Sequence, residues 1–268
     1  MPELPEVETV VKGLQKQLVN QRIKRVEVIT PQLRFPVPPS LKRIFTASHI
    51  HDITRRAKYI LIHTDKGILL NHLGMTGTWR EDVSEKKHDH FKLYLESGKC
   101  LVYNDPRRFG YIDYFDPKQS CHWLEHLGPE PLDKKSFNKD YLLSRLKTSR
   151  SPIKTFIMNQ KNVVGVGNIY ASEALFMANI NPLRPSDKIK KQEAEALIDS
   201  IQKVLRRAIK KGGSTIRDFK SAGGSQGYFQ MEFKVYGREG LPCSFCGRPI
   251  KQLKIGQRSS FYCSKCQK

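Results

Sequence analysis

Cys243-Ser244-Phe245-Cys246 and Cys263-Ser264-Lys265-Cys266 are two Cys-x-x-Cys pairs near the end of the chain, with 16 residues between them. Four thiolates at this spacing bind Zn²⁺ tetrahedrally, each pair on its own knuckle, and the segment between them can form a β-hairpin. Such a site has no open coordination position, so the pattern predicts one structural Zn²⁺ per chain at Cys243, Cys246, Cys263 and Cys266. Two disulfides are the alternative, which a chain without the pattern of a secretory signal does not favour.

Outside this module the charge balance is the strongest signal. The 268 residues carry 47 Lys and Arg against 26 Asp and Glu, a net charge of +21. An excess of this size opposes compaction unless a polyanion is the working partner, so it predicts binding to nucleic acid. An anionic membrane surface is the alternative, but the sequence has no basic amphipathic helix with an aromatic face and no apolar run near the roughly 18 residues that span a bilayer. The cysteine usage fits a reducing compartment, so we expect a cytoplasmic protein.

The pattern of apolar residues changes along the chain. A helical spacing of apolar residues over 7–18 is followed by short strand-like runs between turn residues. These runs are at residues 22–29, 59–63, 68–73, 91–95, 100–103 and 111–115. After a hinge-like Gly128-Pro129-Glu130-Pro131, the sequence predicts helices at 139–146, 152–158, 169–177, 188–211 and 215–219, and a loop at 221–227.

These patterns predict a multidomain α+β chain, because many short strands imply a sandwich or a barrel and the helices come after them. We expect an N-terminal β-sandwich with flanking helices over residues 1–131. A helical domain over 132–231 and a four-cysteine zinc-finger hairpin over 232–268 complete the predicted organisation.

The first residues have two interpretations. Met1-Pro2-Glu3-Leu4-Pro5-Glu6 precedes an amphipathic segment and is typical of a helix N-terminus, where proline and acidic side chains are favoured. Alternatively, removal of Met1 exposes the secondary amine of Pro2, which can attack a sugar aldehyde or C1′ and form an iminium. Glu3 and Glu6 are then within reach to move protons.

Several short motifs, in order along nearly the whole chain, resemble the bacterial formamidopyrimidine-DNA glycosylases, which excise 8-oxoguanine and ring-opened purines. Besides residues 1–9 and the four cysteines, the similar motifs are Arg55-Arg56-Ala57-Lys58-Tyr59, His72-Leu73-Gly74-Met75, Lys87-His88-Asp89-His90, Asp105-Pro106-Arg107-Arg108-Phe109-Gly110, Gly165-Val166-Gly167-Asn168-Ile169-Tyr170 and Gln257-Arg258. The resemblance implies that residues 1–131 form the catalytic domain and that residues 132–231 contain a helix–two-turn–helix element.

The resemblance assigns the base-excision chemistry to the N-terminus. It implies that Pro2, after loss of Met1, is the nucleophile on C1′ of the damaged nucleotide. Glu3 is then the acid that protonates the sugar ring oxygen, and Glu6 is a supporting carboxylate. With Met1 retained, the Pro2 nitrogen would be an inert amide.

The same resemblance implies roles in strand cleavage for two cationic residues. Lys58 is implied to donate a proton for β-elimination, and Arg258 to grip the phosphate beside the lesion and to act in δ-elimination. From the residues alone, each could equally be a surface cation of a basic chain. Many members of the family have Gly where this chain has Gln257, which affects the expected shape of the hairpin tip.

Further residues are implied to contact DNA. Met75, Arg107 and Phe109 match three residues that fill the gap left by a flipped base, where a thioether, a planar cation and an aromatic ring replace lost stacking. Without the motifs, core packing would be the ordinary interpretation of Met75 and Phe109. The loop at 221–227 resembles a mobile cap over the extruded base.

DNA contacts are implied at four other positions. His88 is implied to contact DNA; its sequence neighbours also allow a metal ligand, but no third ligand completes such a site. Asn168 begins a helix after Gly165-Val166-Gly167, and helix N-termini bind phosphate. Arg150 and Lys154 flank this helix and are implied to contact phosphate, with a solvated basic face as the alternative.

The resulting interpretation is a bifunctional DNA glycosylase and AP lyase that acts as a monomer on damaged duplex DNA, with no cofactor in the chemistry. An endonuclease VIII-type enzyme, with the same fold and nucleophile but a preference for oxidised pyrimidines, is one alternative; Leu4 and Val7-Glu8-Thr9 favour the purine-lesion branch by resemblance. A non-catalytic zinc-ribbon binder of nucleic acid is another. It would explain the charge and the cysteines but not the amine and acids at the N-terminus.

Overall fold

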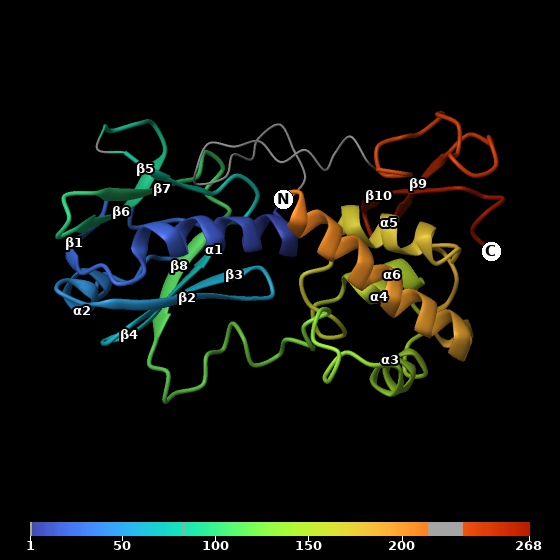
Figure 1. The fold of residues 1–268 in the computed structure, drawn as a ribbon, viewed down its shortest axis with the longest axis horizontal. Helices are drawn as coiled ribbons and strands as arrows, with labels where there is room; N and C mark the ends of the chain where they lie inside the picture. The colour runs from blue at the N-terminus through green and yellow to red at the C-terminus, as the bar shows by residue number, and fades with distance from the viewer. Residues whose placement is uncertain (1, 83, 214–232) are drawn as a thin grey trace. The chain divides into compact units, whose positions relative to one another are not determined.

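The computed structural model describes residues 2–82, 84–213 and 233–268, and these form two compact units (Figure 1). Unit 1 comprises the described residues up to Glu125, together with Gly212 and Gly213. Unit 2 comprises His126–Lys211 and the described residues from Phe233 onward. The domain boundaries at residues 131 and 231 stay predictions, and the predicted helix at 215–219 and loop at 221–227 lie outside the described residues.

Unit 1 begins with α1 (Leu4–Leu18), whose start is fixed by its own sequence. Pro5 occupies the first turn, where its missing N–H costs nothing. Glu3 and Glu6 form a capping box, in which the Glu3 backbone N–H donates to the Glu6 carboxylate at 2.8 Å. The apolar residues three and four positions apart are buried, and α1 packs against β2 (Ile50–Arg56) and β3 (Tyr59–Thr64).

Two four-stranded antiparallel sheets form the body of unit 1. One has the order β1-β6-β7-β5 and the other β2-β3-β4-β8. Their remaining strands are β1 (Ile23–Val28), β4 (Gly67–His72), β5 (Thr78–Glu81), β6 (Asp89–Leu95), β7 (Cys100–Asn104) and β8 (Tyr111–Phe115). One apolar core contains Phe91 and Leu93 from the first sheet and Ile60 and Ile62 from the second, so the predicted β-sandwich is confirmed.

Three elements of unit 1 have little sequence signal, and the sequence analysis did not predict them. In β2 the first and fourth residues are buried while His51 and Asp52 between them are exposed, so the strand shows no regular alternation. The strand β5 has four residues and exists through its pairing with β7. The helix α2 (Leu41–Phe45) is a five-residue turn held by Leu41 and Phe45 in the core.

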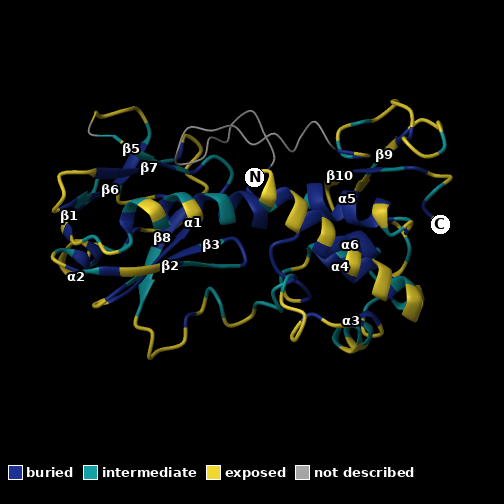
Figure 2. Ribbon diagram, in the orientation of Figure 1, coloured by how far each residue is buried: buried dark blue, intermediate teal, exposed yellow. Residues whose placement is uncertain are grey.

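Unit 2 contains α3 (Lys139–Leu146), α4 (Ile153–Met158), α5 (Asn168–Met177) and α6 (Lys191–Lys210). The helix α5 is apolar on all sides, and it packs against α4, α6 and the C-terminal hairpin. Figure 2 shows this difference, with α5 almost wholly buried and α6 carrying a row of exposed residues. The sequence predicted α6 from residue 188, but a 3-10 turn at Ser186–Lys188 comes first.

The end of the chain forms the expected hairpin, from β9 (Lys251–Ile255) and β10 (Arg258–Tyr262). Gly256 and Gln257 connect them with positive φ angles of 52° and 62°, the geometry of a two-residue hairpin turn that matches the strand twist. Gln257 therefore allows the same tight two-residue turn that a glycine at this position would allow. Among the described residues, no helix is both long and apolar enough to cross a membrane.

Candidate functional site

The N-terminal residues lie in a buried environment at the start of α1. Pro2 is buried, and the side chains of Glu3 and Glu6 are exposed by 3% and 0%. The Glu6 carboxylate accepts the Glu3 backbone N–H, so the helix cap holds both acids next to Pro2 in the chain. Both interpretations of this stretch are compatible: it is a helix N-terminus, and it places an amine position beside two carboxyl groups that water does not reach.

Lys58 lies in the tight turn between β2 and β3. Ala57 before it has a φ of 54°, and the Arg55 guanidinium fixes the turn by donating to the Ala57 carbonyl at 2.9 Å and to the Glu8 carboxylate at 2.8 Å. Lys58 is 8% exposed, so its ammonium group is not a solvated surface charge.

His72, at the end of β4, is half-buried, and no role was predicted for it. Its Nδ1 accepts the Gly74 N–H at 3.0 Å, and its ring stacks on Tyr111 with centroids 5.1 Å apart. Burial, reinforced by the charges of Lys58 and Arg34, lowers the pKa of His72 to about 3. The ring therefore stays a hydrogen-bond acceptor at neutral pH and supports the turn that carries Met75.

Met75 and the pair Arg107 and Phe109 lie on two loops of unit 1. Phe109 is 42% exposed, and the Arg107 guanidinium carbon lies 4.7 Å from the centroid of its ring. Met75 is half-buried. An aromatic side chain with this exposure is not a core residue, so the core interpretation of Phe109 is wrong.

Asp105 joins these two loops. Its fully buried carboxylate accepts the Thr76 hydroxyl at 2.5 Å from one loop, and the backbone N–H groups of Gly110 at 2.8 Å and Arg107 at 3.3 Å from the other. A hydrogen bond to a buried charged group is worth about 1.5–3 kcal/mol, so this carboxylate is a strong link between the loops. This role of Asp105 was not predicted; its only sequence signal is an acid in the turn Asn104-Asp105-Pro106.

Close backbone packing adds to this link. A Cβ at Gly74 would lie 2.3 Å from the Gly110 nitrogen, and Gly74 has a φ of 64°. Cβ atoms at Gly77 and Gly110 would lie 2.3 Å and 1.9 Å from the Tyr103 hydroxyl oxygen. The two loops approach each other so closely that only glycine fits at these positions.

The other predicted contact residue of unit 1, His88, is half-buried in a left-handed conformation, with φ 74°. Its carbonyl accepts the Asp105 N–H at 3.0 Å. Among the described residues the only cluster that could hold a metal is the four cysteines, so His88 is not part of a metal site there.

In unit 2 the structure brings Lys154 and Asn168 to the strand that begins with Arg258. The Lys154 ammonium, 1% exposed, donates to Asn168 Oδ1 and Ser260 Oγ, each at 2.6 Å. The Asn168 amide donates to the Ser259 carbonyl at 2.9 Å. Lys154 therefore fixes β10 to the start of α5 and is not on a solvated basic face, whereas the Arg150 side chain is 94% exposed.

The four cysteines have the geometry of a zinc site. Their Sγ atoms all lie within 4.8 Å of one another, with Cys243 and Cys266 at 3.9 Å and Cys246 and Cys263 at 3.5 Å. A disulfide needs about 2.05 Å between sulfurs, whereas four thiolates at about 2.3 Å from a tetrahedral Zn²⁺ are about 3.8 Å apart. The residues fit the ion, and the disulfide alternative does not fit.

Glu173 anchors the start of this zinc module to α5. Its buried carboxylate accepts the backbone N–H groups of Lys234, Val235 and Tyr236, each at 2.9 Å. Burial nevertheless raises the pKa of Glu173 above its usual range. The sequence signal for this role is a lone Glu in an otherwise apolar helix.

Family models match most of the chain. The formamidopyrimidine-DNA glycosylase N-terminal domain matches residues 1–112, the H2TH domain of the same enzymes matches 127–220, and a zinc finger found in FPG and IleRS matches 240–268. This chain belongs to the formamidopyrimidine-DNA glycosylase family. Curated formamidopyrimidine-DNA glycosylases of Stenotrophomonas maltophilia and Vibrio parahaemolyticus are each 47% identical over 100% of both chains.

Solved structures of formamidopyrimidine-DNA glycosylases share the fold. A Lactococcus lactis Fpg in complex with DNA containing an abasic site has a TM-score of 0.91 at 35% identity, covering 99% of each chain. The MutM (Fpg) protein of Thermus thermophilus has a TM-score of 0.89 at 36% identity, covering 99% of this chain and 98% of that one. The chain is a base-excision repair enzyme for oxidised purines, a DNA glycosylase with AP lyase activity and one structural zinc ion. The non-catalytic and endonuclease VIII-type alternatives are therefore set aside.

Proposed function

We propose that Pro2, with Met1 removed, is the nucleophile that displaces 8-oxoguanine or a formamidopyrimidine from duplex DNA. The observation that carries this proposal is the burial of Glu3 and Glu6 beside Pro2. An α-amine has an unperturbed pKa of about 8, which leaves part of it neutral at pH 7, whereas a lysine at about 10.4 is almost fully protonated. The N-terminal amine is thus a better nucleophile than Lys58.

The proposed reaction starts at the sugar of the damaged nucleotide. Glu3 donates a proton to the ring oxygen O4′ as the Pro2 nitrogen bonds to C1′, and the base leaves with the electrons of the glycosidic bond and takes up a proton. The Pro2 nitrogen then loses its proton, and its lone pair forms an iminium at C1′ as the C1′–O4′ bond breaks and O4′ becomes a hydroxyl group. Glu6, which accepts the Glu3 N–H, is a positioning residue for this acid.

Strand cleavage follows from the iminium. Loss of a proton from C2′ expels the 3′ phosphate, and a second elimination expels the 5′ phosphate. We assign the proton donation of the β-elimination to Lys58 and the phosphate contact of the δ-elimination to Arg258. The burial of Lys58 in the turn between β2 and β3 supports this assignment over that of a solvated surface cation.

Damaged duplex DNA is the proposed partner of a monomer acting in the cytoplasm, at the nucleoid. Met75, Arg107 and Phe109 fill the gap left by the extruded base, held as one unit by Asp105. His88 and Arg150 are proposed to contact the DNA. The predicted phosphate contact of Lys154 is replaced by a positioning role, because its buried ammonium, together with Asn168, fixes the strand that carries Arg258. Relatives from Lactococcus lactis solved with DNA containing an abasic site or Fapy-dG support this partner.

Borohydride trapping on an 8-oxoguanine duplex tests the proposal. Protein with a free Pro2 should form a covalent adduct that maps to residue 2, whereas protein that retains Met1 or carries an N-terminal tag should bind the duplex and form none. Pro2→Gly keeps an amine and should retain part of the trapping. An adduct at Lys58, or equal trapping by tagged protein, would show that the nucleophile is assigned wrongly.

A further inference from the structure

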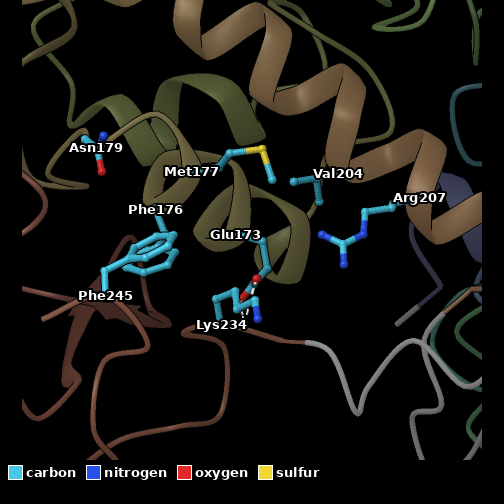
Figure 3. Close-up of a pocket in the computed structure, with 8 residues that line it drawn as sticks. All are labelled: Glu173, Phe176, Met177, Asn179, Val204, Arg207, Lys234 and Phe245. Carbon is cyan, nitrogen blue, oxygen red and sulfur yellow. Dashed lines mark hydrogen bonds between the residues drawn. The ribbon is translucent and has the colours of Figure 1, made fainter. Parts of the chain in front are cut away.

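A pocket of about 250 Å³ lies within unit 2, and none of its described lining residues has a role in the proposed chemistry (Figure 3). Its lining includes Phe176 and Met177 from α5, Val204 and Arg207 from α6, Lys234, and Phe245 from the first zinc knuckle. Small-molecule sites commonly measure about 300–1,000 Å³, so a pocket of this size suits a single large side chain.

Phe245 is the unusual member of this set. It is 71% exposed, and its ring lies flat against Phe176, with centroids 5.3 Å apart and an interplanar angle of 13°. The second zinc knuckle has the same Cys-Ser-x-Cys pattern with Lys265 in the corresponding position. A solvated residue therefore satisfies the knuckle geometry, and zinc binding does not explain an exposed aromatic ring at Phe245. Met177, also 38% exposed, extends the apolar surface.

The charges around the apolar lining are positive. Arg207 and Lys234 contribute cationic side chains (Figure 3). Glu173, the only acid among the described lining residues, is 6% exposed and accepts three backbone N–H groups. A carboxylate next to an apolar side chain complements this lining. A second copy of the chain is a poor occupant, because each copy carries a net charge of +21.

We propose that this pocket binds the carboxyl-terminal end of an acidic peptide whose last residue is bulky and apolar. The terminal side chain enters the pocket between Phe245 and Met177. Its α-carboxylate and the preceding acids pair with Lys234 and Arg207, as in other sites that capture a chain terminus. The enzyme would thereby be recruited by a partner protein with an acidic tail, through a site separate from its chemistry.

The test uses full-length zinc-loaded protein and fluorescein-labelled Asp-Asp-Asp-Asp-Leu-Phe with a free terminal carboxylate, measured by fluorescence anisotropy. Phe245→Lys places a lysine in the first zinc knuckle at the position that Lys265 occupies in the second, and it adds a positive charge. A merely electrostatic interaction would tighten, whereas the proposal predicts binding at least tenfold weaker. Lys234→Glu should also weaken binding at least tenfold, while the matched charge change Lys265→Glu should alter it less than twofold.

Two further arms complete the experiment. The same peptide ending in Ala-Ala should bind at least tenfold more weakly, and Phe245→Lys should excise 8-oxoguanine at the rate of the unaltered protein. Equal binding of the two peptides, tight binding by Phe245→Lys, or displacement of the peptide by undamaged duplex DNA would overturn the proposal. Because excision is measured separately, failure here leaves the proposed function untouched.

Discussion

The two units hold their functional residues by different means. In unit 1, the loops with Met75 and Phe109 are locked by close glycine contacts and by the buried Asp105 carboxylate. In unit 2, the hairpin with Arg258 has two short strands, and Phe261 joins it to a small apolar cluster. It is held by four thiolates and by the buried Lys154.

This difference separates two kinds of preorganisation. The sandwich core of unit 1 holds its loops in place, so the arrangement of Met75, Arg107 and Phe109 should persist without any ligand. The hairpin of unit 2 requires Zn²⁺, because structural zinc contributes an apparent 10–16 kcal/mol, about the whole stability of a small domain. The comparison predicts that the functional residues of unit 1 and those of unit 2 can be disrupted independently.

Loss of zinc should give the largest effect. Cys246→Ser removes one of the four ligands, so zinc should be released and DNA binding abolished while unit 1 stays folded. Zinc content by elemental analysis and duplex binding by anisotropy measure the two losses. Both tryptophans, Trp79 and Trp123, lie in unit 1, so unchanged tryptophan fluorescence is the control. Protein that loses zinc yet binds DNA normally would refute the dependence of the hairpin on the metal.

Glu3→Gln tests the chemistry of unit 1 with the hairpin intact. Loss of a positioned acid typically costs about 10²–10⁴-fold in rate, so single-turnover excision of 8-oxoguanine should fall by that factor. Duplex affinity should not change. Cleavage of a preformed abasic site should be partly retained, because the ring of that sugar opens without the enzyme. Parallel losses on both substrates would mean that Glu3 acts through the fold and not as the acid.

The sequence predicted the parts of this site that depend on residue type at fixed spacing. The four cysteines and the start of α1 are local patterns, and each can be interpreted without knowing the fold. Asp105 and Glu173 could not be assigned in this way, because their roles come from partners far along the chain: Thr76, 29 positions from Asp105, and Val235, 62 positions from Glu173. The same is true of β2 and β5. These strands form by pairing with neighbouring strands, more than through an alternation of buried and exposed residues.

Thr76→Val tests the link between the two loops of unit 1. It removes the hydroxyl that donates to Asp105 and keeps the shape of the side chain, so Met75 should lose its alignment with Arg107 and Phe109. We expect excision to fall about tenfold, which corresponds to about 1.4 kcal/mol, just under the range of about 1.5–3 kcal/mol for a hydrogen bond to a charged group. Thr78→Val is the matched control, because the Thr78 hydroxyl makes no hydrogen bond within the described part of the chain.

Base extrusion can be separated from chemistry in the same variant. With 2-aminopurine next to the lesion, Thr76→Val should show a slower fluorescence rise, whereas cleavage of a preformed abasic site should change less than threefold. If extrusion is as fast as in the unaltered protein, the Asp105 link does not position the three residues.

The smallest expected effect concerns Arg258 and the salt dependence of binding. Each phosphate that a cation neutralises contributes about 0.9 to the slope of log affinity against log salt concentration. Arg258 begins β10 and is exposed, so Arg258→Ala should reduce the slope by about 0.9 and also reduce δ-elimination. Lys265→Ala, an equal loss of charge on the same zinc module, should leave the slope unchanged if Lys265 contacts no phosphate. Equal slope changes in both variants would mean that Arg258 acts through overall charge, and the hairpin would then lack a specific phosphate contact.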